Sequence, residues 1–206
     1  MKRAVLTSLA VLMAVTAALV LTPVIALAHP GHVNSNGMSH GFIHPVTGID
    51  HVLAMVAVGV IAAQIGGRAI WLVPLSFMTV VAFAGALGMA GIQLPFAEVG
   101  IALSVVVLGL AITFSLRLSM LAAMALVGFF ALFHGYVHGV EMPTAVSALA
   151  YAAGFVAGTA LLHAIGLGLG LWFGSEGERL RHRVAQAGGG AMALFGATIL
   201  VGAFSA

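Results

Sequence analysis

The chain contains no cysteine and very little charge. The absence of cysteine excludes disulfide bonds, thiolate metal sites and cysteine nucleophiles. Only 6% of the residues are charged, whereas a soluble domain carries roughly 25%. With a net charge of +2, the chain cannot form the basic surface that nucleic-acid binding requires. These absences leave little polar surface that could face water.

Hydrophobic sequence is what the chain has in abundance. Of its 206 residues, 62% are hydrophobic, and the mean hydropathy is +1.20. Such a chain is expected to be surrounded by a lipid bilayer rather than by water. The 27 glycines favour close crossings between membrane helices. The predicted fold class is therefore all-α, a polytopic bundle of membrane helices, which we place in the bacterial inner membrane.

The N-terminal segment has the parts of a secretory signal peptide. Lys2 and Arg3 precede a long apolar run, Pro23 breaks it, and Ala26 and Ala28 form a small-x-small cleavage site. An uncleaved membrane anchor is the alternative. Three parts are expected along the chain: a signal peptide (1–28), a periplasmic leader that contains histidines (29–42) and a transmembrane domain (43–206).

Six apolar segments follow the signal peptide. Each is close to or above the length of about 20 helical residues that crosses the hydrocarbon core. If the mature N-terminus is periplasmic, the later arginines all fall in alternate, cytoplasmic loops, as the positive-inside rule requires. Six spans with this orientation are therefore predicted. The segments are 43–64, 70–91, 97–115, 119–140, 144–173 and 184–204, and the arginines are Arg68, Arg117, Arg179, Arg181 and Arg183.

The first of these segments opens with a dense polar group. Pro45 suits the first turn of a helix, so we expect His44 at or near its N-cap. On one continuous helix, His44 and His51 would share nearly the same face, about 10 Å apart along the axis. Asp50 could bind an ion directly or orient a histidine. Met55, one turn below His51, could add a thioether ligand.

A second polar group closes the fourth segment. His134, His138 and Glu141 follow at i, i+4 and i+7, so they lie on one side of a helix. The first segment runs inward and the fourth runs outward, so His51 and His134 are expected at matching depth. Ionisable side chains inside a bilayer are costly and usually mark a pathway or a site. We therefore expect the two groups to converge if their helices are neighbours.

The donors in these two groups favour a divalent transition metal. Imidazole and carboxylate ligands suit nickel or cobalt, and the ligand list does not separate these ions from zinc. Other polar residues keep two interpretations. His29, His32 and His40 form either a polar leader or a weak metal-capturing segment, and His163 is either a packing residue or a lower part of the pathway. Glu98 is interpreted as a helix-boundary residue and His182 as a solvated one.

The two motifs resemble those of a known family. The segment His44-Pro45-x-x-Gly48-x-Asp50-His51 and the segment from Phe133 to Pro143 are similar to the patterns of the HupE/UreJ family. These are membrane accessory proteins of hydrogenase and urease systems, regarded as nickel permeases. The resemblance implies that His44, Asp50 and His51 are essential for nickel passage and that His134, His138 and Glu141 are their partners. It also implies a functional link to hydrogenase or urease maturation.

The sequence thus favours a non-enzymatic permease that moves a divalent metal ion, with nickel preferred, into the cytoplasm. The ion is the substrate, and no cofactor is expected. The main alternative is an intramembrane zinc-dependent hydrolase that uses the same histidines, although no HExxH or GxSxG motif is present. A haem protein with His51 and His134 as axial ligands is a third possibility. The sequence leaves the oligomeric state open.

Overall fold

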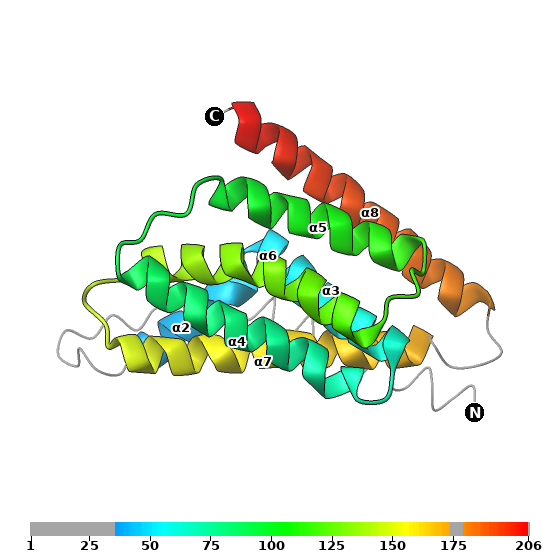
Figure 1. Cartoon of the computed structure of the whole chain (residues 1–206), viewed down its shortest axis with the longest axis horizontal. Helices are drawn as coiled ribbons and strands as arrows, with labels where there is room; N and C mark the ends of the chain where they lie inside the picture. The colour runs from blue at the N-terminus through cyan, green and yellow to red at the C-terminus, as the bar shows by residue number, and fades with distance from the viewer. Residues whose placement is uncertain (1–35, 174–178, 206) are drawn as a thin grey trace. The chain divides into compact units, whose positions relative to one another are not determined.

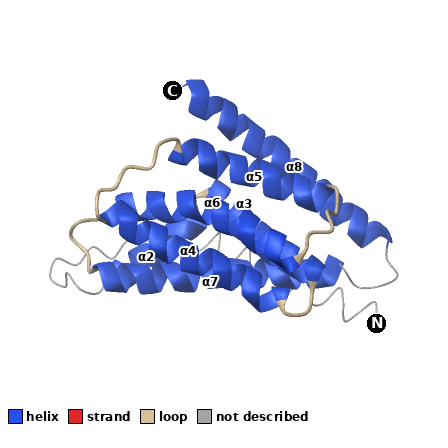
Figure 2. Ribbon diagram, viewed as in Figure 1, coloured by secondary structure: helices blue, strands red, loops and turns tan. Residues whose placement is uncertain are grey.

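The computed structural model describes residues 36–173 and 179–205, which belong to one compact unit, Val33–Ala206. Every regular element in these two ranges is a helix (Figures 1 and 2), so the predicted all-α fold class is confirmed. The predicted signal peptide, and residues 29–35 of the predicted leader, lie outside the described residues. The helices are α2 (Asn36–Thr47), α3 (Ile49–Ile65), α4 (Ala69–Met89), α5 (Ala97–Thr113), α6 (Met120–Val140), α7 (Ala148–Phe173) and α8 (Arg179–Ser205).

The helices differ in how well they suit a membrane span. By length and hydropathy, α4, α6, α7 and α8 each qualify, and α2 with α3 forms a fifth candidate if the bent pair counts as one span. Helix α5 is apolar but has only 17 residues, fewer than the roughly 20 that cross the hydrocarbon core upright. The chain is therefore a multi-pass membrane protein with four to five candidate spans, and the count of six stays a prediction.

The first predicted span is not one continuous helix. It is divided at Gly48 into α2 and α3, whose axes differ by 82°. Pro45 lies inside the last turns of α2 rather than at a helix start, so the prediction that His44 caps a helix is wrong. Proline lacks the N–H that continues a helix, and the Thr47 hydroxyl donates to the His44 carbonyl at 3.0 Å, satisfying one acceptor at the helix end.

The helix α2 also extends into the predicted leader. Residues 36–42 are helical, and they pack against α7. The contact is close because glycines face the opposite backbone on both sides. A Cβ at Gly41 would collide with the Tyr151 carbonyl, and one at Gly154 would collide with the Met38 carbonyl. Close backbone approach of this kind is how small residues join helices in a membrane.

Glycine contacts likewise join α4 to α6. A Cβ at Gly135 would meet the Val81 backbone, and one at Gly139 would meet the Gly85 backbone. The most extensive helix contacts in the described part of the chain are those of α4 with α6, α5 with α8, and α7 with both α2 and α3. Contacts between these groups are fewer, as between α3 and α6 or α4 and α7. The molecule is thus built from helix groups that are tightly packed internally.

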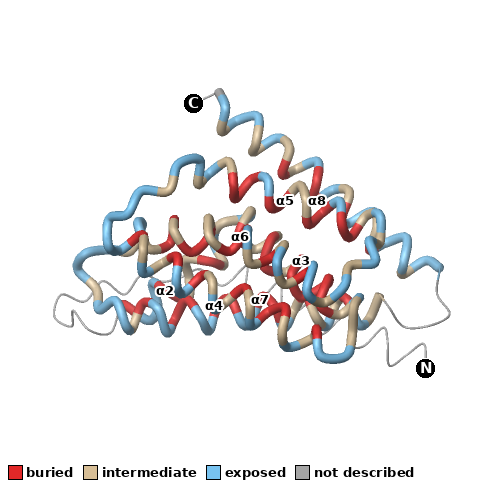
Figure 3. The backbone as a smooth tube through the Cα atoms, viewed as in Figure 1, coloured by how far each residue is buried: buried red, intermediate tan, exposed pale blue. Residues whose placement is uncertain are grey.

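The outward surface of these helices is apolar. Trp71, Leu121 and Leu194 are each more than 70% exposed. Figure 3 shows buried residues alternating with exposed ones along the helices. Large exposed hydrophobic side chains on long helices are expected where the surroundings are lipid rather than water.

Candidate metal centre

The polar residues of both motifs surround a pocket of about 310 Å³. It lies where α2 meets α3, beside the C-terminal end of α6 and the first turn of α5. Three carboxylates and three histidines contribute to it, which is unusual in a chain with so little charge. We call it the histidine pocket, and its lining residues are His44, Thr47, Gly48, Asp50, His51, Glu98, Val137, His138 and Glu141.

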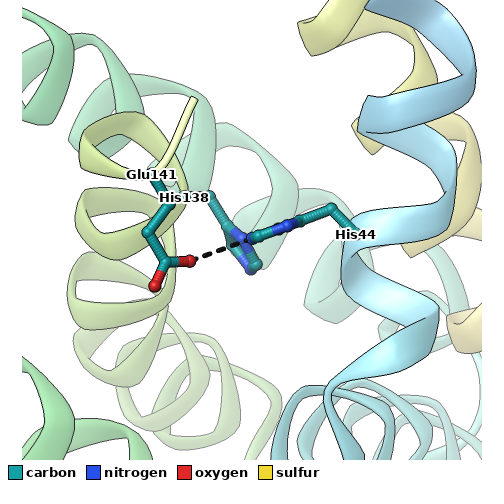
Figure 4. Close-up of side chains that lie close together, drawn as sticks. All are labelled: His44, His138 and Glu141. Carbon is teal, nitrogen blue, oxygen red and sulfur yellow. Dashed lines mark hydrogen bonds and ion pairs between the residues drawn. The ribbon is translucent and has the colours of Figure 1, made fainter. Parts of the chain in front are cut away.

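The mouth of the histidine pocket holds three side chains that could share one metal ion. One ligand atom from each of His44, His138 and Glu141 lies within 4.8 Å of the other two. The His44 ring comes from α2 and points toward the end of α6, which supplies the other two side chains (Figure 4). His44 Nε2 lies 3.0 Å from Glu141 Oε2, so a hydrogen bond joins two of the potential ligands.

Asp50 orients His51 at the side of the pocket. His51 Nδ1 lies 2.8 Å from Asp50 Oδ1, and the His51 amide donates to the same oxygen at 2.9 Å. The carboxylate therefore fixes the tautomer in which Nδ1 carries the proton and Nε2 keeps its lone pair. His51 Nε2 is buried and has no hydrogen-bond partner among the described residues. This is the arrangement in which a carboxylate prepares histidine to bind metal.

His138 stands at the centre of a row of imidazole rings. Its ring centroid is 4.7 Å from that of His44 and 4.5 Å from that of His51. His51 in turn lies 5.2 Å from His134. The row leads from the half-exposed His44 to the fully buried His134.

His134 ends this row with one nitrogen available. Its Nδ1 lies 3.0 Å from the Phe130 carbonyl, which can accept only from a protonated nitrogen. The Nε2 lone pair is consequently free for a ligand, and this atom is buried with no hydrogen-bond partner in the described part of the chain. A buried polar atom without a partner is costly, and a bound cation would remove that cost.

The structure brings together the six main residues expected from the sequence: His44, Asp50, His51, His134, His138 and Glu141. Their arrangement differs from the expectation in one respect. His44 and His51 do not share a face of one helix, because the chain bends at Gly48, and they meet instead through the His138 ring. That these residues bind metal stays a prediction.

The structure places the less favoured candidate ligands in different surroundings. His29 and His32 lie outside the described residues. Met55 is fully buried in the apolar core, and its thioether ligand role stays a prediction. His40 is exposed on α2.

Two residues near the pocket were not assigned to it from the sequence. Glu98, interpreted as a helix boundary, lines the histidine pocket from the first turn of α5. Tyr151 lies on α7 with its ring centroid 6.1 Å from that of His44, and its hydroxyl is buried. Glu98 could have been recognised as an acidic residue at the same end of the bundle as Glu141. Nothing in the sequence around Tyr151 indicates its position.

A second pocket of about 430 Å³ lies at the other end of α3. Its polar side chains include Gln64, Ser115, Arg117 and His182. Ser115 Oγ is 3.3 Å from His182 Nε2 and accepts a hydrogen bond from the Gln186 amide at 3.5 Å. We call it the arginine pocket, and its lining residues are Ile61, Gln64, Ile65, Ser115, Leu116, Arg117, Leu118, Gly170, Phe173, His182 and Ala185.

Comparison with known proteins agrees with the two motifs. The family model described as "HupE / UreJ protein" matches residues 17–199. The chain is 48% identical over 188 residues to Protein HupE of Rhizobium leguminosarum bv. viciae, a match that covers 91% of this chain and 96% of that protein. No solved structure matches the chain. The sequence match spans both motifs and nearly all of the described helices, so this chain belongs to the HupE/UreJ family.

Proposed function

We propose that the chain is a membrane permease that moves a divalent transition-metal ion, with nickel preferred, into the cytoplasm through the histidine pocket. The proposal depends chiefly on the three potential ligands at the pocket mouth, His44, His138 and Glu141, whose ligand atoms lie within 4.8 Å of one another. Nitrogen and oxygen donors in this ratio suit a borderline ion such as nickel or cobalt. Membership of the HupE/UreJ family supports the same function.

The geometry suits passage better than permanent retention. His44 and Glu141 are partly exposed, with side-chain accessibilities of 32% and 49%, so an ion can reach them from the surrounding solvent. The third side chain at the mouth, His138, is buried, and its ring centroid lies 4.5 Å from that of the buried His51. A series of adjacent sites lets an ion bind well enough to be selected and weakly enough to move on. Family resemblance adds the expectation that the ion serves hydrogenase or urease maturation.

The function is tested by metal accumulation in cells that lack other importers of nickel and cobalt. Cells that express the chain should accumulate labelled nickel, and cells that express the combined His44→Ala and Glu141→Gln variant should accumulate no more than the empty-vector control. The matched control is His182→Ala, which removes an exposed histidine at the opposite pocket. Equal accumulation by the combined variant and the wild type, at equal membrane expression, would refute the proposal.

Selectivity and the enzymatic alternative are tested on the purified protein. Proteoliposomes are supplied with nickel, cobalt and zinc in turn, and uptake of each ion is compared. A permease exchanges its ion with added chelator within the time of an uptake assay. A hydrolase would instead retain its metal through purification and cleave a lipid or peptide. That result would refute the permease and support the enzymatic alternative.

A further inference from the structure

One histidine on α7, His163, is buried outside the histidine pocket. His163 is only 3% exposed, and neither ring nitrogen has a hydrogen-bond partner among the residues that the structure describes. A histidine that served only as packing would be expected to satisfy at least one nitrogen, because a buried polar atom without a partner destabilises the fold. His163 therefore needs another explanation.

The position of His163 continues the row of imidazoles. The ring of Phe77, from α4, has its centroid 5.7 Å from that of His134 and 5.2 Å from that of His163. Phe77 is fully buried. The ring of Phe77 therefore lies between His134, the innermost histidine of the row in the histidine pocket, and His163.

The hydroxyl of Thr159, close to His163 on α7, is a second buried polar group without a hydrogen-bond partner in the described part of the chain. Thr159 precedes it by one helical turn on α7, so both side chains lie on one face of the helix. Thr159 is 1% exposed, and its hydroxyl has no hydrogen-bond partner within residues 36–173 and 179–205. Two adjacent buried polar groups without partners indicate a site for a ligand rather than an isolated defect in packing.

We propose that His163, with Thr159, forms an inner binding site for the permeating divalent cation, separated from the histidine pocket by the ring of Phe77. The inference rests on the proposed transport function and adds a site to it. Imidazole nitrogen and hydroxyl oxygen are donors that a borderline divalent ion accepts. The cation passes from His134 to His163 when the Phe77 ring moves aside.

The arginine pocket lies further along α7 from the proposed inner site. Gly170, two turns further along α7, lines the arginine pocket, so His163 lies about 10 Å from it along the helix axis. The order from one end of the bundle to the other is thus the histidine pocket, His134, Phe77, the inner site and the arginine pocket.

The first test uses the absence of cysteine from the chain. In the His163→Cys variant the introduced thiol is the only one, so its modification by a small cationic methanethiosulfonate reagent reports access to this position. Nickel ions should slow the modification at least fivefold, whereas magnesium ions should not. The matched control is His182→Cys in the arginine pocket, where nickel should change the rate less than twofold.

The rate of thiol modification either supports or overturns the inner site. Modification of the His163→Cys thiol that nickel slows supports an inner site on the ion's route. Modification at a rate that nickel does not change, or no modification under conditions that label the His182→Cys thiol, overturns the inner site.

The second test separates ligand binding from packing. The His163→Leu variant fills a similar volume with an apolar side chain, so a packing role predicts normal or improved stability and unchanged nickel uptake. An inner ligand predicts a loss of uptake of tenfold or more while nickel still binds to the purified protein at the histidine pocket. Uptake equal to that of the wild type overturns the inner site and leaves the transport function standing. Absence of uptake by the wild type itself would overturn both.

Discussion

The two pockets at the ends of α3 differ in the sign of their charge. The histidine pocket contains the carboxylates of Asp50, Glu98 and Glu141 together with three imidazoles. The arginine pocket is larger, and its fixed charge is the guanidinium of Arg117. The histidine pocket is therefore expected to concentrate cations more strongly than the arginine pocket, because local charge sets the concentration of ions in a cleft.

The comparison also concerns the state of the histidines. In the histidine pocket, Asp50 holds His51 with its Nε2 lone pair free. In the arginine pocket, His182 Nε2 is paired with Ser115. One pocket thus leaves imidazole nitrogens available for metal, and the other uses its imidazole in a hydrogen bond. The lesson is that histidine content alone does not identify a metal site, since the partner of each nitrogen decides its use.

The largest expected effect separates the two pockets directly. His138→Ala removes the ring that links His44 to His51, and uptake of nickel should fall by about 100-fold or more, since even an outer-shell substitution costs 10- to 100-fold. His182→Ala should change uptake less than about twofold, because no proposed ligand is lost. Initial rates in proteoliposomes measure both. Similar losses in the two variants would abolish the distinction between the pockets.

A smaller effect is expected from the carboxylate that orients His51. Asp50→Asn keeps the shape of the side chain but removes the charge that fixes Nδ1–H, so nickel affinity should fall about 10- to 100-fold. Isothermal titration of the purified protein measures this change. Asp50→Glu serves as the control, because it retains a carboxylate. An unchanged affinity in Asp50→Asn would show that His51 does not act as a ligand.

Acidification should weaken uptake progressively. Only the neutral imidazole binds metal, so protons compete with the ion for the ring nitrogens as the pH falls. Nickel uptake at pH 5.5 should therefore be several-fold lower than at pH 7.5. Uptake is measured with the pH varied only on the side of the histidine pocket. A rate that rises on acidification would contradict binding by these histidines.

The smallest effect concerns the shape of the pocket. A Cβ at Gly48 would lie 2.9 Å from His51 Nδ1 and 3.0 Å from Asp50 Oδ1, so the pair must shift in the Gly48→Ala variant. We expect a fewfold reduction in nickel uptake with normal expression. The matched control is Gly168→Ala, an exposed helical position on α7 where a Cβ meets no atom within 4 Å. Identical uptake by both variants would show that the pocket tolerates this displacement.

The helices could be predicted from the sequence because most of them correspond to one continuous apolar segment of the chain. The predicted segments 70–91 and 119–140 nearly coincide with α4 and α6. The bend at Gly48 could not be predicted in this way, because Pro45 suits both a helix start and a helix end. The outcome depends on contacts of α2 with α7, such as that of Gly41 with Tyr151, which are distant in sequence.

The candidate site was predictable to a similar extent. The spacing of His134, His138 and Glu141 places them on one side of α6 from local geometry alone. The roles of Glu98 and of Phe77 require knowledge of which helices are neighbours, and no periodicity contains that information. The motifs therefore identified the candidate ligands on single helices, whereas the surrounding residues could be found only from the packing between helices.

The glycine contacts that join the helices in groups have a consequence for motion. His44, Asp50, His51, Thr159 and His163 belong to the group of α2, α3 and α7, whereas Phe77, His134, His138 and Glu141 belong to the pair of α4 and α6. Backbones packed at glycine cannot slide apart without losing close contacts. The seam between the two groups is less extensively packed. The three potential ligands at the mouth of the histidine pocket are therefore divided between the two groups, with His44 on one side and His138 and Glu141 on the other. A small rotation of one group against the other would change the distances between them.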